Sequence, residues 1–396
     1  MRNVSHSYQA SQPQVTRVAM VLYAVDDRGV SRVCRKVSVH LASNGVDVIL
    51  IPLTYREPVT WSSPPGVSVD PPITRYRRPT AAIPRLALAI RRHRPDVLFA
   101  HLNGPVRATI LAKRLARVPS PIVAVEHVDF DTVYRPGWVK NWLISSLYPL
   151  ADRVAGVTPG IVQDLEERFP KLVGKTAVLP STGPDLDEVR QLKGEVANHD
   201  WYRGAAHPRL ICSVANIIER KGQDTLIRAL PLVRERAGDV RLVLVGRFDD
   251  AAYVTKLKEM AWTLGVGNHV SFAGYVENPL PFIAGADVFA LASRSEGLPM
   301  VLHEAMACGV PVVSTDCPGE GPSFALEDGR AGLLVPVGDA PALALAILRV
   351  LNESALRNSL VAKGLERVRD FTPQRVAESY LAVARDCVAS MAGGGK

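Results

Sequence analysis

Two glutamates, Glu296 and Glu304, stand eight positions apart in a stretch that is otherwise apolar or small, SEGLPMVLHEAMACGVPVV (295–313). An ionised carboxylate that loses its water without gaining a partner is strongly disfavoured, so both side chains need partners. The pattern predicts a loop and then a helix that begins near Pro299 and ends at Gly309, because proline suits the first helical position and glycine the position after the last. This helix has no clearly polar face, so we expect it to be buried together with Glu304.

Glu296 is expected in the loop at the positive end of that helix, where backbone N–H groups lie free. A structural carboxylate, held by an arginine or by backbone amides, is the alternative explanation for either residue. Two carboxylates that flank one helix N-terminus instead favour a binding site.

Two cations, Arg220 and Lys221, lie in the stretch VANIIERKGQDTLI (214–227). A strand is expected to end and a helix to begin at these residues. Two cations at a helix N-terminus oppose the helix macrodipole, which favours anions there. An anionic ligand would resolve this conflict, whereas solvation of both charges would explain them without a ligand. The following strand ends at Gly246, whose missing side chain would let a flat base or a ribose approach.

The first half of the chain offers two further candidates at the ends of expected strands. Gly29 is predicted to be the pivot of a tight turn flanked by Arg28 and Arg32, which makes either a phosphate-facing loop or a plain turn. His127, in AVEHVDFDTVYRP (124–136), is predicted at the end of a strand and pointing into a cleft, with a purely structural histidine as the alternative.

The elements that position these residues are short β-branched runs separated by segments with helical periodicity. Near-continuous apolar runs of this length indicate strands covered on both faces, as in a parallel sheet with helices on each side. The predicted strands are 17–25, 46–53, 96–102, 122–128, 153–158 and 176–180, and then 209–215, 240–246, 270–273, 287–292, 310–315 and 331–335. The fold class is therefore α/β, with two doubly wound Rossmann-like domains whose ligands bind at the carboxyl ends of the strands, in the cleft between the domains.

The domain limits follow from the polar, turn-rich stretch at 181–208. We expect a loose tail at 1–14, a first domain at 15–190, a linker at 191–207, a second domain at 208–370 and an amphipathic helix in 371–396 that packs on the rest of the chain.

Composition narrows the class of protein. The chain has 396 residues, 47% of them hydrophobic and 22% charged, which describes an ordinary globular protein. Its net charge of +8 favours anionic partners such as nucleotide diphosphates, anionic lipid surfaces or nucleic acid. Five scattered cysteines without a C-x-x-C spacing predict neither a zinc site nor a disulfide framework and suit the reducing cytoplasm. The longest early apolar run, 18–25, is too short to span a membrane.

Taken together, the motifs resemble the donor-binding half of the family-4 retaining glycosyltransferases of GT-B fold. The resemblance rests on the E-x7-E pair of Glu296 and Glu304, and on RKG, LVLVG, GADVFALASRSEGLPMVLHEAMACGVPVVSTDCPG and GLLVPVGD. It is strong over residues 205–375 and looser in the first half, through HLASNGVDVILI and ADRVAGVTPGIVQDL.

The resemblance implies a role for each candidate. Glu304 would accept hydrogen bonds from the ribose of a nucleotide-sugar donor, and Glu296 would lie by the transferred sugar. His127 would lie near the reacting side of the sugar, the loop at Arg28 and Gly29 would close over the diphosphate, and the last helix would cross back to the first domain. The remaining donor-binding positions would be Asn216, Gly246, Arg247, Val276, Gly297, Leu298, Pro299 and Met300.

The leaving diphosphate is the point at which this chain departs from the family. Lys221 and Arg220 would neutralise its charge, but Asn216 stands where relatives commonly have a further arginine. The negative charge of the diphosphate would then be neutralised by Lys221 and Arg220 alone, or with the help of an arginine of the first domain, Arg28 or Arg32.

No metal or other cofactor is expected. GT-B enzymes use cationic side chains and a helix N-terminus in place of a metal held by D-x-D. Of the two D-x-D matches, 185–187 lies near the linker and 129–131 on the acceptor side.

The sequence thus predicts metal-independent, retaining transfer of a hexose or N-acetylhexosamine from a UDP-linked donor to a hydroxyl, by front-face attack. The acceptor would be lipid-linked, no nucleic acid would bind, and the protein would be cytoplasmic or peripheral at the inner face of the membrane. The arginines of 75–94 would contact anionic lipid. The alternatives are an NDP-sugar epimerase, a glycosyl phosphorylase, or a basic membrane-surface or nucleic-acid binding module.

Overall fold

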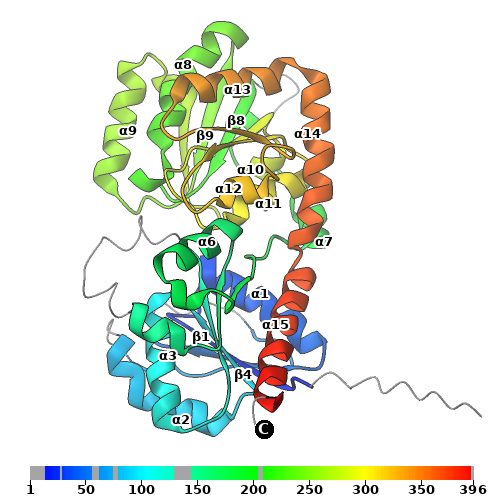
Figure 1. Ribbon diagram of the computed structural model, residues 1–396. Coiled ribbons are helices and arrows are strands. Elements are labelled where there is room, and N and C mark those ends of the chain that lie inside the picture. The colour runs from blue at the N-terminus through cyan, green and yellow to red at the C-terminus, as the bar shows by residue number, and fades with distance from the viewer. Residues whose placement is uncertain are drawn as a thin grey trace, which may run out of the picture.

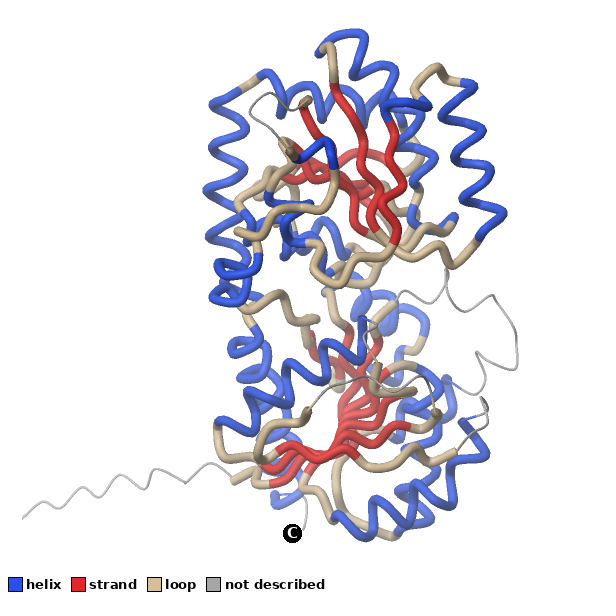
Figure 2. The backbone as a smooth tube through the Cα atoms, turned by 180° about the vertical axis from the view of Figure 1, so that it is seen from behind, coloured by secondary structure: helices blue, strands red, loops and turns tan. Residues whose placement is uncertain are grey.

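The chain folds around two parallel β-sheets, seen in a computed structural model that describes residues 14–26, 29–55, 62–74, 79–128, 144–203 and 208–393 (Figure 1, Figure 2). The first sheet has the order β3-β2-β1-β4-β5-β6-β7 and the second the order β10-β9-β8-β11-β12-β13. Every strand pairing recorded in both sheets is parallel. The predicted class, two doubly wound α/β units, is confirmed.

The strands follow the predicted apolar runs with ends shifted by up to three residues. Those of the first sheet are β1 (Arg17–Leu22), β2 (Asp47–Pro52), β3 (Val67–Val69), β4 (Val97–His101), β5 (Ile122–Glu126), β6 (Arg153–Gly156) and β7 (Thr176–Val178). Those of the second are β8 (Arg209–Val214), β9 (Val240–Val245), β10 (Val270–Gly274), β11 (Val288–Leu291), β12 (Val312–Asp316) and β13 (Leu333–Pro336). Strand β3 was not predicted, because its three residues at the edge of the sheet are too few to produce a pattern.

Helices cover both faces of each sheet. The described α-helices before β8 are α1 (Gly29–Ser43), α2 (Ile83–His93), α3 (Asn103–Ala116), α6 (Pro159–Arg168) and α7 (Leu186–Leu192). Those after β8 are α8 (Gln223–Ala237), α9 (Ala251–Thr263), α10 (Leu280–Ala284), α11 (Met300–Cys308), α12 (Gly321–Ala325), α13 (Ala340–Asn352), α14 (Ser354–Arg367) and α15 (Pro373–Gly393). None of the described helices is long and apolar enough to cross a membrane.

The alternation of side chains along the strands divides the core of the second sheet in two. Ile211 of β8 faces a cluster built with α8, α9 and α13. Its neighbours Leu210 and Cys212 face the opposite side, where α10 and α11 pack. That second cluster is continuous with the core of the first sheet, so one apolar core runs through both halves of the molecule.

The last helix links the two halves. From α14 the chain runs down the side of the molecule, and α15 packs against α1 of the first half (Figure 1). Its buried residues Val376, Tyr380, Ala384 and Cys387 recur at helical spacing, as predicted for an amphipathic helix. Residues 1–13 of the predicted tail lie outside the described residues, and the limits of the domains and of the linker at 191–207 stay predictions.

The order of the strands reverses next to β1 in the first sheet and next to β8 in the second. The loops that follow the carboxyl ends of the two sheets touch each other. The hydroxyl of Thr158, after β6, donates to the backbone oxygen of Gly319, after β12, at 2.7 Å. Ligands of such sheets bind at these ends of the strands, so this is where the candidate residues are expected to gather.

Candidate functional site

The helix that contains Glu304 forms as the sequence predicts. Pro299 precedes the first turn of α11, and Gly309 ends the helix with a φ of 77°, a left-handed conformation that glycine adopts without strain. Leu302, Ala305 and Met306 are buried. Both glutamates are also shielded, Glu296 with 5% and Glu304 with 6% of its surface exposed. Each carboxylate therefore needs a partner, and the structure gives each a different one.

Glu296 is held by the cations that precede α8. Its carboxylate forms an ion pair with the ammonium group of Lys221, and the guanidinium of Arg220 lies 3.6 Å from its second oxygen. The hydroxyl of Ser293 donates to the same carboxylate at 2.6 Å. Lys221 is itself largely buried, with 17% of its side chain exposed. The buried carboxylate and the two cations at the helix N-terminus thus neutralise each other in part.

These contacts set the protonation state of Glu296. Burial opposes ionisation, but the positive charges of Lys221 and Arg220 and the hydrogen bonds from Lys221 and Ser293 outweigh it and hold the pKa of the carboxyl below its ordinary value. Glu296 is therefore an anion at neutral pH, and the group of three side chains carries one net positive charge.

The loop between Glu296 and α11 offers unused backbone donors. Gly297 and Leu298 are buried, and the amides of Gly297, Leu298 and Met300 donate to no other described residue. Buried N–H groups without partners are rare in folded proteins. Together with the positive end of α11, they form a cradle for negatively charged oxygens.

Glu304 is paired across the two halves of the molecule. Its carboxylate accepts a hydrogen bond at 3.1 Å from Arg32 of α1, which is 272 residues away in the sequence. The side chain of Arg32 remains 38% exposed, so water partly screens this pair. Arg32 was considered from the sequence only as a partner for a diphosphate, and its contact with Glu304 was not foreseen.

The backbone around Gly246 requires a glycine for a structural reason that the sequence did not suggest. Its φ is 152°, and a Cβ there would lie 2.0 Å from the backbone oxygen of Ala215. The close approach of these two strand ends therefore requires glycine whether or not a base or ribose binds beside it. Neighbouring Asn216 is exposed and donates from its side chain to Asp249 at 2.8 Å.

Two other predicted donor residues lie near Gly246. The guanidinium of Arg247 stacks on the ring of Tyr275 with 4.2 Å to the ring centre. Val276, the residue after Tyr275, is half-buried against the core. The backbone oxygen of Arg247 accepts from Ile217 at 2.8 Å, which ties these positions to the Asn216 loop. They form a second group that adjoins the Glu296 cluster through the segment from Asn216 to Lys221.

His127 follows β5 and meets the Glu296 loop from the other half. A Cβ on Gly297 would lie 1.8 Å from the backbone oxygen of His127, so the two loops are in direct backbone contact. The imidazole of His127 is buried, and its Nε2 lies 3.0 Å from Nδ1 of His101 at the end of β4. Burial lowers the pKa of His127 to about 3, which leaves the ring neutral at pH 7.

Three further predictions concern the turn at Gly29, the loop residue Arg28 and the two D-x-D matches. Gly29 is the first residue of α1, and its φ lies outside the left-handed region, so it is not the pivot of a tight turn. Arg28 and the D-x-D at 129–131 lie outside the described residues. In the second D-x-D, Asp185 caps α7 by accepting from the amide of Asp187 at 2.8 Å.

Two residues of the site, Ser293 and His101, were missed by the sequence analysis, as was the contact of Arg32 with Glu304. Ser293 and His101 lie at or just after strand ends, as His127 does. No other feature of the sequence indicates that this serine or this second histidine belongs to a site. The role of Arg32 toward Glu304 depends on the packing of the two halves. Among the described residues, no three His, Cys, Asp or Glu side chains gather where they could hold a metal ion.

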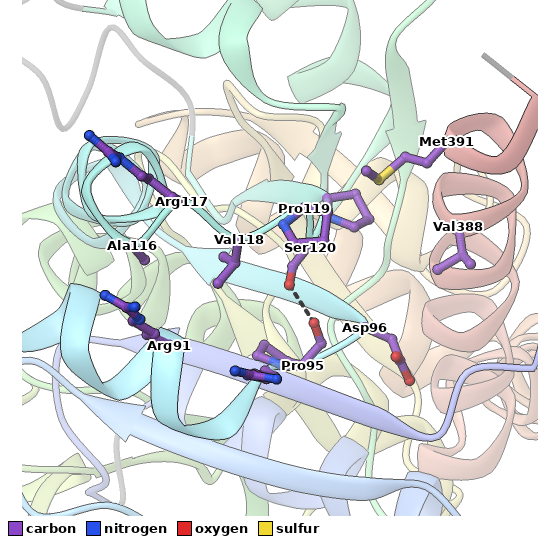
Figure 3. A pocket seen from close by; sticks show the side chains of 12 residues that line it. Arg91, Pro95, Asp96, Ala116, Arg117, Val118, Pro119, Ser120, Val388 and Met391 are labelled. Carbon is purple, nitrogen blue, oxygen red and sulfur yellow. Dashed lines mark hydrogen bonds between the residues drawn. The ribbon is translucent and has the colours of Figure 1, made fainter. Parts of the chain in front are cut away.

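A cavity of about 660 Å³ lies elsewhere (Figure 3). It is lined by the ends of α2 and α3, the segments that lead into β4 and β5, and the end of α15. It is therefore at the amino ends of the strands, away from the glutamates. Arg91, Arg94 and Arg117 stand around it.

The ion pairs of Glu296 predict how stability depends on pH. Because its pKa in the folded protein lies below the ordinary value of 4.5, its contribution is present above that pH and is lost as the pH falls through the folded-state pKa. We expect Glu296→Gln to be less stable than the wild type by about 1 to 3 kcal/mol near neutral pH, with the difference shrinking in acid. Thermal unfolding midpoints of both proteins over the acid range measure this. A difference that stays constant into acid would contradict the assignment.

Comparisons with known proteins place this arrangement in a family. Residues 28–182 match "Glycosyltransferase Family 4" and residues 208–353 match "Glycosyl transferases group 1". The chain is 32% identical over 305 residues to the phosphatidyl-myo-inositol mannosyltransferase of Mycobacterium leprae, which covers 73% of this chain and 72% of that protein.

Other relatives match over a shorter region. The lipopolysaccharide core biosynthesis glycosyltransferase LpsE of Rhizobium meliloti is 38% identical over 173 residues, 43% of this chain and 48% of that protein. A GDP-mannose-dependent alpha-(1-6)-phosphatidylinositol monomannoside mannosyltransferase of Mycolicibacterium smegmatis is 36% identical over 205 residues, 49% of this chain and 52% of that protein. The match therefore spans about half the length of these two relatives.

Solved structures agree on the fold. A glycosyltransferase from Rickettsia africae superposes with a TM-score of 0.78 at 16% identity, over 95% of this chain and 99% of that one. HepE of Anabaena, solved in complex with UDP, gives a TM-score of 0.72 at 18% identity, over 94% of this chain and all of that one (100%). The chain thus belongs to glycosyltransferase family 4 and is a glycosyltransferase with the two-domain GT-B fold.

Proposed function

We propose that the chain transfers a hexose or N-acetylhexosamine from a nucleoside diphosphate sugar to a hydroxyl acceptor, with retention of configuration and without a metal. The observation that carries the proposal is the site around α11. One buried carboxylate precedes the helix and the other lies within it, two cations contact the first, and the amides of Gly297, Leu298 and Met300 have no hydrogen-bond partner among the described residues. Family membership favours transfer over the epimerase and phosphorylase alternatives.

Glu304 is the proposed ribose clamp. Its carboxylate can accept hydrogen bonds from both ribose hydroxyls, which would replace the single hydrogen bond from Arg32. The exchange is feasible because Arg32 is partly exposed and can move away without stranding a buried charge. The released guanidinium, on α1 of the first half of the molecule, would then be available to the donor.

The charges of the site and of a diphosphate suggest a second role for Arg32. Lys221, Arg220 and Glu296 together carry one net positive charge, whereas the diphosphate of a nucleotide sugar carries two negative charges. Arg32, once freed from Glu304, would supply the second positive charge. It would thereby take over the role of the arginine that relatives commonly have at the position of Asn216.

The chemistry requires charge stabilisation at the leaving group. Glycosyl transfer passes through an oxocarbenium-like transition state while negative charge develops on the diphosphate. Lys221 and Arg220 would donate hydrogen bonds to the departing oxygens, and the amides of the loop from Gly297 to Met300 would add further donors. The acceptor hydroxyl would attack from the face that the diphosphate leaves, and no protein nucleophile is assigned.

The nucleotide is proposed to be uridine diphosphate, and donors that carry uridine or guanosine diphosphate provide the test. HepE was solved with UDP, and one relative is named as GDP-mannose-dependent. Binding of UDP-glucose, UDP-N-acetylglucosamine and GDP-mannose should therefore be compared directly.

The acceptor is proposed to be lipid-linked, at an anionic membrane surface. Two relatives are named for phosphatidylinositol-based substrates and one for lipopolysaccharide core. Of the arginines predicted to meet lipid, Arg92 is paired with Asp70 and Arg85 donates to the oxygen of Ile73. Arg91 and Arg94 are exposed and form no ion pair with another described residue.

Loss of the ribose clamp should weaken donor binding. Hydrogen bonds to a charged group contribute roughly 1.5 to 3 kcal/mol, so we expect Glu304→Ala to raise the donor Kd about ten- to a hundredfold. Isothermal titration with the donor that the wild type binds measures this, with Glu277→Ala at an exposed position as the control. An unchanged Kd in a folded Glu304→Ala protein would refute the proposed site.

Arg32 can be tested by comparing ligands with and without the diphosphate. If it neutralises the diphosphate, Arg32→Ala should weaken binding of UDP or GDP about tenfold. Binding of uridine or guanosine should not weaken, because these ligands lack the diphosphate and no longer compete with Arg32 for Glu304. Glu304→Ala should instead weaken both kinds of ligand, because both contain the ribose. Equal affinity of Arg32→Ala and wild type for the nucleoside diphosphate would remove Arg32 from the leaving-group site.

Membrane contact has its own test. We expect the protein to sediment with liposomes that contain anionic phospholipid and to remain in the supernatant with neutral liposomes, more so at low salt. The double variant Arg91→Ala with Arg94→Ala should reduce sedimentation without changing donor affinity. A wild type that never sediments would remove the membrane contact and leave the donor site unaffected.

A further inference from the structure

His101, which no comparison assigns a role, lies directly behind His127. It is the last residue of β4, it is completely buried, and its Nδ1 lies 3.0 Å from Nε2 of His127. The centres of the two rings are 5.3 Å apart. The two histidines are therefore joined by one hydrogen bond, whose direction depends on which nitrogen carries the proton.

Both rings are neutral at pH 7. Burial lowers the pKa of His127 to about 3, and burial together with the neighbouring His127 lowers the pKa of His101 well below its ordinary value. Two neutral imidazoles 3.0 Å apart need one proton between them, because two lone pairs would repel and two N–H groups would clash.

The far side of His101 decides which ring supplies this proton. Its Nε2 is buried and has no hydrogen-bond partner among the described residues. A proton on Nε2 would be a buried N–H without an acceptor, which proteins avoid more strictly than an unused lone pair. His101 therefore carries its proton on Nδ1 and donates it to Nε2 of His127. His127, as the acceptor at Nε2, then carries its own proton on Nδ1.

The C-terminal helix holds His101 in this orientation. The ring of Tyr380, from α15, lies nearly parallel to that of His101 with 6.1 Å between their centres. Tyr380 also packs on Phe99 of β4 at 5.0 Å. Its hydroxyl is buried and has no partner among the described residues, so it does not offer an acceptor to Nε2 of His101.

We propose that His101 is a positioning residue that fixes the tautomer of His127, so that His127 presents an N–H donor at Nδ1 to an oxygen of the transferred sugar. This inference rests on the proposed function, because it takes the sugar to lie beside His127. It implies that the site selects donors whose sugar has an acceptor oxygen at that place, such as a hydroxyl.

The tautomers can be measured without any ligand. In protein labelled with ¹⁵N-histidine, the imidazole nitrogen shifts should show that His127 and His101 are both protonated on Nδ1 at neutral pH. The signals are assigned by comparison with His101→Asn and His127→Asn. A proton on Nε2 of His127 would overturn the inference, whether or not the protein binds nucleotide sugars.

Binding tests the consequence for the sugar. In His101→Asn the side-chain amide N–H can replace Nδ1–H, whereas the similarly sized leucine of His101→Leu cannot. We expect His101→Leu to weaken binding of UDP-glucose or GDP-mannose about tenfold and to leave binding of UDP or GDP unchanged, with His101→Asn within about threefold of wild type.

The outcomes separate the two proposals. A wild type that binds neither nucleotide nor nucleotide sugar refutes the proposed function, and the ¹⁵N spectra then decide the tautomer alone. Equal losses in His101→Asn and His101→Leu, or an equal loss for nucleotide and nucleotide sugar, would overturn the role of His101 while the proposed function stands.

Discussion

The contact between Glu296 and the two cations before α8 is the interaction on which the site depends. A carboxylate so deeply buried keeps its charge only because Lys221 and Arg220 lie against it. The same contact joins the loop after β11 to the junction after β8, and Arg220 strengthens it by donating to the oxygen of Ser295 at 2.6 Å. These two loops therefore form one unit, and neither can shift without exposing an unpaired charge.

Glu304 is also a buried carboxylate that needs a partner, but its partner is of a different kind. Glu304 takes its partner from the other half of the molecule, and that partner is partly exposed. A pair of this kind is weaker and can be exchanged for a ligand, whereas the Glu296 pair is built into one half. The site thus combines a fixed charge cluster with a carboxylate whose partner is replaceable, as binding and releasing a substrate requires.

Local patterns could be predicted from the sequence, and contacts between distant residues could not. Strands buried on both faces appear as continuous apolar runs, and the helix of Glu304 is bounded by Pro299 and Gly309, so these elements were predicted close to their observed limits. The pairing of Arg32 with Glu304 depends on how the two halves dock. Gly246 shows a further limit of prediction from sequence. Close packing of two strand ends and close approach of a ligand both require glycine, so the residue type alone cannot tell one role from the other.

A backbone contact joins the two halves of the molecule at the candidate site. A Cβ on Gly297 would overlap the backbone oxygen of His127, so no side chain separates the loop of Glu296 from the end of β5. Side chains can adopt other rotamers, but a backbone-to-backbone contact leaves little freedom. The separation between the histidine of the first half and the charge cluster of the second is therefore set by the packing of the main chain. Only the side chains that line this contact can change their positions without moving the main chain.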